Sequence, residues 1–345
     1  MTSFARSLRA LSLSMIASVA SACGTDSVSA TPPDAASDVV SDTADASPEV
    51  SVDVAPDVVV DAPADVTVDA GACANRSFTA GDFTRHLRVG GVDREYLVHV
   101  PRGLDASRPA MLVFNFHGYL SNAAQQADWS NMNEAADARG FIAVHPQGRD
   151  TSWNAGVCCG LAQTRGDDDV GFVRAMLDAL SAEQCVDPHR VFATGFSNGA
   201  FLSNRLACEL SDRIAAIAPV SGDTGVSPCE PRRHVPVLHF HGDADLVVPY
   251  LGSPALRFPP VNTDIAAWAM RNGCATSASV TFDRGDTRCV TFERCPDDGE
   301  VQLCTIRGGG HTWPGGDVPA LGGLTGRALD ATTAMLDFFA RHPLP

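Results

Sequence analysis

The sequence predicts one α/β domain, with a mostly parallel sheet and helices on both faces, behind an N-terminal segment of a different kind. Three observations predict this architecture. From about residue 88 onward, short apolar runs alternate with helix-length amphipathic stretches. The run 111–116 is largely apolar, as expected of a parallel strand buried on both faces. The segment 73–345 also has a length, 273 residues, that suits one large domain.

The expected elements follow in chain order. The predicted strands are an early pair ending at 98–101, then 111–116, 141–145, 190–194, 214–220, 235–240 and 301–306. The predicted helices are 122–139, one that begins after Asp167–Asp169, 198–210 and 328–341. In the second of these helices Phe172, Met176 and Leu180 fall on one side, which indicates a helix packed on the sheet. Asp168 and Asp169 are expected to cap its start.

Residues 1–22 carry the features of a signal peptide. Arg6 and Arg9 precede an apolar run over residues 10–20, which is too short to span a bilayer, and a small-residue cleavage site ends at Ala22. Cys23 follows directly, and the tetrapeptide ASAC resembles the processing site of bacterial lipoproteins, where the cysteine is acylated. We therefore expect an extracellular or cell-surface protein, either released after cleavage or held at the outer membrane by a lipid on Cys23.

Residues 23–72 form the predicted spacer. From residue 24 to residue 72 there are eleven acidic residues, no Arg and no aromatic residue, and Asp recurs at every fourth position from Asp53 to Asp69. Such a segment cannot bury enough apolar surface to offset the entropy lost on ordering, so it is predicted to be disordered and solvated. Calcium binding by these Asp residues is the alternative, but known calcium loops place acids at alternate positions around a Gly turn.

The charge balance restricts the partners of the domain. The chain has a formal net charge of −16, and the domain 73–345 holds 23 Arg against 30 acidic residues, or −7. A surface of this sign disfavours nucleic acid as a partner. The sequence contains no Lys. This excludes a P-loop, Schiff-base chemistry and a Ser–Lys dyad.

The cysteines indicate disulfides. Of the eleven cysteines, ten remain when Cys23 is set aside, and an even number in an exported chain is typical of disulfide pairing. The adjacent Cys158 and Cys159 are not expected to be both free. A late group is expected to pair locally: Cys274, Cys289, Cys295 and Cys304. Zinc is the alternative for this group, but it has no CxxC pair and no His at ligand spacing.

The segment Gly195-Phe196-Ser197-Asn198-Gly199 has the pattern G-x-S-x-G. The pattern alone is common, but here an apolar strand precedes it and a helical pattern follows, as a nucleophile elbow requires. The turn holds Ser197 in a strained conformation at the carboxyl end of the sheet, and glycines on either side avoid a clash. The N–H of Asn198 then lies at a helix start, where it can bind an oxyanion.

A base and an acid are expected later in the chain. His311 follows the last strand in a Gly308–Gly310 loop that can aim its imidazole at Ser197, whereas His342 lies almost at the C-terminus. Both Asp243 and Asp245 follow the strand 235–240. Asp245 is favoured because apolar residues follow it directly, as suits a buried acid, and Asp243 is expected to brace the turn.

The second oxyanion donor is expected in the loop after the strand 111–116. The backbone N–H of Tyr119 occupies the corresponding position, and His117 is expected to hydrogen-bond structurally rather than to act as a base. Trp153 and Trp313 lie near strand ends and are predicted to line the substrate pocket, with plain packing as the alternative.

Seven segments together resemble the extracellular polyhydroxybutyrate depolymerase and feruloyl esterase family: HGYLSNAAQQADW, FIAVHPQG, WNAG, DDVGF, GFSNGAF, HGDADLVVPY and GGGHTWPGG. They extend over about Arg88 to Phe338 in the order the family has them. The resemblance implies an α/β-hydrolase fold without metal or organic cofactor, acting on esters of polymers or plant wall material. It also supports Ser197, Asp245 and His311 position by position. Members often have Cys where Tyr119 stands, which bears on the shape of the pocket and not on the backbone donor.

The predicted function is hydrolysis of a carboxylic ester through an acyl-enzyme on Ser197. Polyhydroxybutyrate-type polyester is the favoured substrate, and a feruloyl ester or acetylated xylan is the alternative. Two other classes stay open, a serine peptidase and a catalytically silent surface protein of the same fold. The sequence shows no gating domain of the kind expected for such a peptidase, which argues against the first class. All three triad positions are filled, which argues against the second. A membrane is expected as a partner only through the lipid on Cys23.

Overall fold

The computed structural model describes residues 78–105, 108–296 and 299–345. The expected signal peptide 1–22, Cys23 and the spacer 23–72 therefore lie outside the described residues. Within the described part of the chain, no helix combines the length and the apolar character needed to cross a bilayer.

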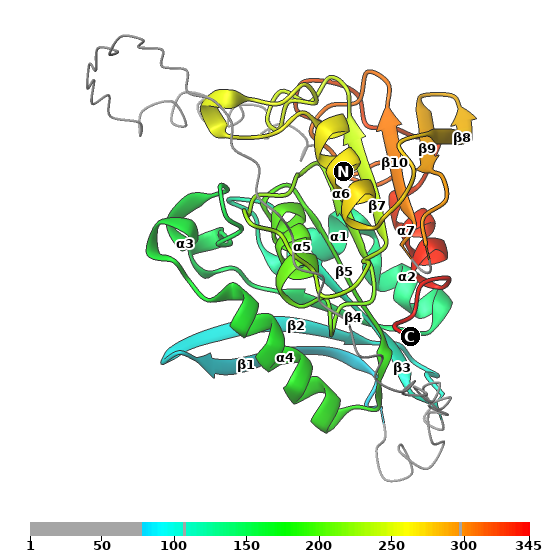
Figure 1. The fold of residues 1–345 in the computed structure, drawn as a ribbon. Coiled ribbons are helices and arrows are strands. Elements are labelled where there is room, and N and C mark those ends of the chain that lie inside the picture. The colour runs from blue at the N-terminus through cyan, green and yellow to red at the C-terminus, as the bar shows by residue number, and fades with distance from the viewer. Residues whose placement is uncertain (1–77, 106–107, 297–298) are drawn as a thin grey trace, which may run out of the picture. The chain divides into compact units, whose positions relative to one another are not determined.

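A ten-stranded sheet forms the centre of the domain, in the order β1-β2-β4-β3-β5-β6-β7-β10-β9-β8 (Figure 1). Its strands are β1 Gly81–Val89, β2 Val92–Val100, β3 Ala110–Phe116, β4 Ile142–Pro146, β5 Val186–Phe196, β6 Ile217–Val220, β7 Val237–Gly242, β8 Ala278–Arg284, β9 Thr287–Phe292 and β10 Val301–Ile306. The six strands from β4 to β10 in this order pair in parallel, and antiparallel pairs extend both edges. The mostly parallel sheet is as predicted.

Helices cover both faces of the sheet, as predicted. The α-helices are α1 Ala123–Ser130, α2 Met132–Arg139, α3 Gly160–Arg165, α4 Asp169–Glu183, α5 Asn198–Glu209, α6 Val261–Arg271 and α7 Ala331–Phe339. The apolar sides of α4, α5 and α6 pack into one buried cluster with Phe114 and Leu112 of β3. Those of α2 and α7 pack into a second cluster on the other face, around Phe192 of β5 and Phe240 of β7. The alternating direction of side chains along each strand produces these two cores.

The observed elements differ from the predicted ones in several places. The expected helix 122–139 is two helices, because Asn131 adopts a left-handed conformation with φ 51° that ends α1 and begins α2. Helices α3 and α6 were not predicted. The hairpin of β8 and β9 was missed because most side chains of β8 are exposed, so that strand lacks an apolar face.

The start of α4 confirms one expected cap and corrects the other. Asp168 is the N-cap residue, and its carboxylate accepts a hydrogen bond from the Gly171 N–H at 2.8 Å. Asp169 is fully buried and does not cap the helix. Its carboxylate forms an ion pair with Arg94 at 2.7 Å and accepts from the Asn154 N–H at 2.7 Å. A buried carboxylate requires such partners, so this acid ties α4 to the first hairpin.

All nine described cysteines are in disulfides. The pairs formed within this part of the chain are Cys158–Cys159, Cys208–Cys229, Cys274–Cys295 and Cys289–Cys304. The expected local pairing of the late group is confirmed, and the zinc alternative for it is excluded because its thiols are consumed.

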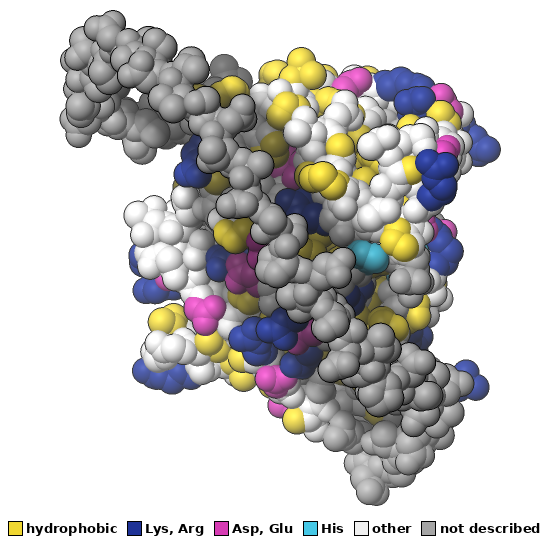
Figure 2. Space-filling view, viewed as in Figure 1, with side chains coloured by type: hydrophobic (Ala, Val, Ile, Leu, Met, Phe, Trp, Pro, Cys, Tyr) yellow, Lys and Arg dark blue, Asp and Glu magenta, His cyan; other side chains and the backbone are white. Residues whose placement is uncertain are grey.

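The described surface of the face seen in Figure 2 carries acidic and basic side chains side by side. Arg165 illustrates this pattern, since its guanidinium pairs with Asp150 and with Asp167, each at 2.7 Å.

Candidate active site

Ser197 stands on a sharp turn between β5 and α5, at the carboxyl end of the sheet. Its backbone angles, φ 55° and ψ −119°, are strained for a residue with a side chain. A Cβ on Gly195 would lie 2.6 Å from the backbone of Gly199 and 2.7 Å from the Phe116 carbonyl oxygen, and a Cβ on Gly199 would collide with that same oxygen. Both glycines therefore let the turn sit against β3, as the pattern G-x-S-x-G predicted.

The loop after β3 lies beside this turn. A Cβ on Gly118 would be 3.3 Å from the Cβ of Ser197. Neither the N–H of Tyr119 nor that of Asn198 has a hydrogen-bond partner within the described part of the chain. Asn198 is also the first residue of α5, whose N-terminus carries positive partial charge. Two unpaired N–H groups next to a serine can stabilise an oxyanion.

His311 and Asp245 form a buried hydrogen-bonded pair. The distance from His311 Nδ1 to Asp245 Oδ2 is 2.7 Å, and both side chains are almost fully buried. The other oxygen of Asp245 accepts hydrogen bonds from the N–H groups of Val247 at 2.8 Å and Val248 at 2.9 Å. These bonds fix the carboxylate in one orientation, so it holds the Nδ1–H tautomer of His311 and leaves Nε2 available as a base.

Asp243 has a different place. Its carboxylate is exposed and accepts a hydrogen bond from the Gly308 N–H at 2.6 Å. Asp243 therefore braces the two loops that carry Asp245 and His311, as expected. Within the described residues its carboxylate forms no hydrogen bond with the His311 imidazole.

The loop of His311 is held from two sides. Its N–H donates to the Leu321 carbonyl oxygen at 2.7 Å, and its ring packs on Phe196 with 4.6 Å between ring centroids. A Cβ on Gly310 would lie 2.5 Å from the Leu321 carbonyl oxygen, so the glycine permits this close approach of the two loop segments.

Ser197 and His311 open into the same cavity, of about 330 Å³. Its other lining residues are mostly apolar: Gly118, Tyr119, Leu120, Ser121, Trp129, Phe196, Val247, Val318, Pro319 and Leu321. A serine and an imidazole at one apolar cavity, with the unpaired N–H groups of Tyr119 and Asn198 close to the serine in the chain fold, suit acyl transfer.

A model of the family described as "Esterase PHB depolymerase" matches residues 94–231. The "Putative esterase NocK" of Nocardia uniformis subsp. tsuyamanensis is 34% identical over 281 residues, covering 74% of this chain and 81% of that protein. The chain belongs to the PHB depolymerase esterase family. It is accordingly a carboxylic ester hydrolase.

A second relative is "Feruloyl esterase B" of Piromyces equi, which is 33% identical over 234 residues, or 63% of this chain. The chain covers only 42% of that protein's length. The acetyl xylan esterase from Aspergillus awamori shares the fold with a TM-score of 0.54 at 15% identity, covering 75% of this chain and 99% of that chain. The α/β-hydrolase fold expected from the resemblance is thereby shown.

Two residues that were predicted to line the pocket, Trp153 and Trp313, are not among the residues that line the cavity. Trp153 is fully buried, donates from its Nε1 to the His117 carbonyl oxygen at 2.9 Å and packs against Phe116. Trp313 is also fully buried and donates to Thr332 Oγ1 at 3.0 Å. Both indoles are core residues, and each N–H has a buried hydrogen-bond partner.

The tryptophan that lines the cavity is Trp129, which the sequence analysis did not single out. It lies on α1 at the end of the segment HGYLSNAAQQADW, and its place in this family segment was the signal that could have pointed to it. Val247 also lines the cavity and was not singled out, although it follows Asp245 by only two positions.

His117 has the structural role expected for it. Its Nδ1 donates to the Gly118 carbonyl oxygen at 2.7 Å, and its Nε2 accepts from the Gly148 N–H at 2.9 Å. Burial lowers the pKa of this imidazole to about 4, so the ring is neutral at pH 7. A neutral ring with both nitrogens engaged holds the loop after β3 in place and is not free to act as a base.

Proposed function

We propose that this esterase works through the triad Ser197, His311 and Asp245. His311 Nε2 removes the proton of Ser197 Oγ as that oxygen attacks the ester carbonyl. Asp245 keeps the imidazole oriented and stabilises its positive charge. The N–H groups of Tyr119 and Asn198 stabilise the negative oxygen of the tetrahedral intermediate. The protonated imidazole then gives its proton to the leaving alcohol, and water attacks the acyl-enzyme by the same steps.

The observation that carries this proposal is the buried 2.7 Å contact between His311 Nδ1 and Asp245 Oδ2, beside a cavity that Ser197 also lines. A fluorophosphonate probe tests it directly, because such probes label only an activated serine. Labelling should occur at Ser197 and disappear in Ser197→Ala and in His311→Ala. Labelling of another serine would move the nucleophile.

For the acyl group we propose an aromatic acid of the feruloyl type. Three rings line the cavity, those of Tyr119, Trp129 and Phe196. A flat aromatic acyl group can stack on such rings, which a hydroxybutyryl unit cannot do. The relative named as a feruloyl esterase supports the same choice.

Polyhydroxybutyrate-type polyester is the second candidate, because the matching family is described by that activity. A panel of methyl ferulate, acetylated xylan, short-chain nitrophenyl esters and polyhydroxybutyrate film separates the candidates. An aromatic site requires a kcat/KM for methyl ferulate well above that for nitrophenyl butyrate, and Trp129→Ala should lower the first more than the second. Equal losses on both esters would remove the aromatic assignment.

We also propose that the enzyme is exported. Nine described cysteines in disulfides support an oxidising compartment, because cytosolic thiols are kept reduced. Residues 1–22 and Cys23 would direct this export, and the spacer 23–72 would separate the domain from its point of attachment.

A further inference from the structure

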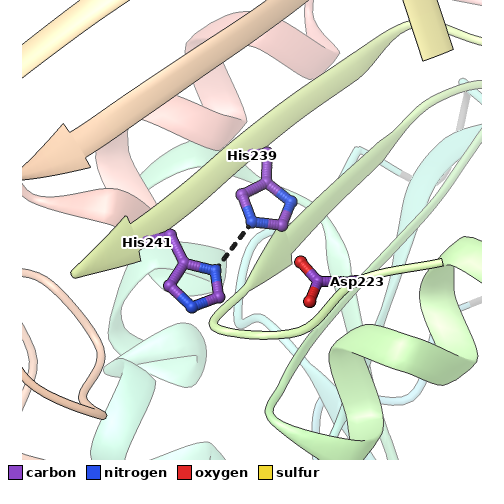
Figure 3. Close-up of side chains that lie close together, drawn as sticks. All are labelled: Asp223, His239 and His241. Carbon is purple, nitrogen blue, oxygen red and sulfur yellow. Dashed lines mark hydrogen bonds between the residues drawn. The ribbon is translucent and has the colours of Figure 1, made fainter. Parts of the chain in front are cut away.

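A buried group of two histidines and one aspartate lies next to the catalytic acid, and the proposed mechanism does not use it. His239 and His241 are two positions apart on β7, so both side chains point to the same face of the sheet (Figure 3). Asp223 follows the neighbouring strand β6 and faces them. One nitrogen or oxygen of each residue lies within 4.8 Å of the others, and all three side chains are buried.

Hydrogen bonds define which nitrogens of the histidines carry protons. His241 Nε2 is 2.8 Å from the Val248 carbonyl oxygen. A carbonyl only accepts, so Nε2 carries the proton and Nδ1 offers a lone pair to the group. His239 Nε2 lies 3.0 Å from that Nδ1, and Nδ1 of His239 has no hydrogen-bond partner within the described residues.

Asp223 provides the second, independent observation. Both of its carboxylate oxygens are buried and lack a hydrogen-bond partner in the described part of the chain. The charges that act most on it are two more carboxylates, Asp264 and Asp245. A buried carboxylate with no donor, close to others of the same sign, is costly unless a proton or a cation neutralises it.

We propose that Asp223, His239 and His241 bind a divalent cation of the zinc class. Two imidazole nitrogens and one carboxylate oxygen are a common zinc ligand set that leaves a fourth position for water, and nitrogen ligands disfavour calcium and magnesium. Ligand histidines commonly donate their other ring N–H to a backbone carbonyl, as His241 does to Val248. Binding replaces the hydrogen bond between the two imidazoles with two coordinate bonds. The proton that His239 Nε2 donates in that hydrogen bond moves to Nδ1 of the same ring, and any proton on Asp223 is released to solvent.

The site joins neighbouring strands and is separate from the nucleophile, so the inference does not depend on the proposed function. Because all three ligands are buried, the cation enters as the chain folds. Its effect would be structural, since it would fix β7 and the segment after β6 beneath the loop that carries Asp245.

The test uses the full chain, without a polyhistidine tag, exported from cells grown with zinc. After dialysis into metal-free buffer, elemental analysis should find about one zinc per chain. Asp223→Asn and His241→Gln should each reduce zinc at least tenfold. His342→Gln, a buried histidine that pairs with Glu300, is the matched control and should keep the zinc. His311→Gln should keep it too, which separates this site from the catalytic imidazole.

Two further measurements keep the result decisive if a variant fails to fold. The wild-type protein expressed with cobalt should show the visible absorption of a protein-bound cobalt ion, and a chelator should lower its Tm. Wild-type protein without zinc, unchanged by chelator, would overturn the proposal and indicate a protonated Asp223. Equal zinc in folded Asp223→Asn and wild type would also overturn it, because the ion would lie elsewhere.

Discussion

His311 Nδ1 lies 2.7 Å from Asp245 Oδ2, although 66 positions separate the two residues in the chain. Their strands explain the contact. Gly242, the last residue of β7, is paired in parallel register with Ile306, the last residue of β10. Neighbouring parallel strands that end at the same level deliver their following loops to the same edge of the sheet. Asp245 and His311 therefore meet because two short loops leave adjacent strands together.

The triad should behave as one unit. Replacing Ser197 or His311 by Ala is expected to lower kcat by about 10⁴-fold or more, and the double variant should lose little more, because each change alone removes the same chemical step. Steady-state kinetics on a nitrophenyl ester measures this. Near-normal activity of His311→Ala would show that the base is another group.

The two aspartates of the HGDAD segment should differ sharply. Asp245→Asn removes the acceptor that fixes the His311 tautomer and should lower kcat by about 10⁴-fold. Asp243→Asn, the matched control, keeps an oxygen that can accept from the Gly308 N–H and should retain most of the activity. If the losses were reversed, the catalytic acid would be Asp243.

Stability should fall with acid through buried neutral histidines such as His145. Burial lowers the pKa of His145 from 6.5 to about 3. Between these values the unfolded chain binds a proton that the native chain does not, so the free energy of unfolding decreases as pH falls through this window. Each such histidine contributes about 1.4 kcal/mol per pH unit there.

Urea unfolding of His145→Gln should therefore show a slope against pH that is smaller by about 1.4 kcal/mol per unit between pH 6 and pH 4. His86→Gln is the control, because the His86 side chain is largely exposed to solvent in the native protein as well as in the unfolded chain. An unchanged slope in His145→Gln would mean that this ring is protonated in the native protein.

The disulfides should contribute measurably to stability. Cys208 and Cys229 are 21 positions apart, and closing a loop of this length constrains the unfolded chain by about 3 kcal/mol. The double variant with Ala at both positions should lose roughly that amount in urea unfolding. Thiol titration of the unfolded, unreduced mature domain should find almost no free thiol. Several reactive thiols would contradict the pairing.

Location should depend on Cys23. If that cysteine is acylated, the full chain expressed in a bacterial host should fractionate with membranes, and Cys23→Ser should release it. If the 49 residues after Cys23, 24–72, behave as the predicted solvated spacer, their mean reach should be about 40 Å, and charge repulsion should extend it. Soluble enzyme from the unmutated chain would indicate cleavage after Ala22 and release, without affecting the catalytic proposal.

The sequence by itself determined the fold class and the catalytic candidates. Alternating apolar and amphipathic segments are local properties of the chain, and so are a G-x-S-x-G turn between a strand and a helix and a glycine-rich loop before His311. The family motifs added the order of these segments. Such signals are readable because each depends on residues close together in the sequence.

Only the tertiary structure decided which distant side chains meet. Trp153 and Trp313 were expected at the pocket and lie in the core, while Trp129 reaches the cavity from α1. The group of Asp223, His239 and His241 was likewise not foreseen, since Asp223 comes from a different segment. Burial and contact depend on how strands are ordered in the sheet, and that order is a property of the whole packed chain rather than of any segment of it.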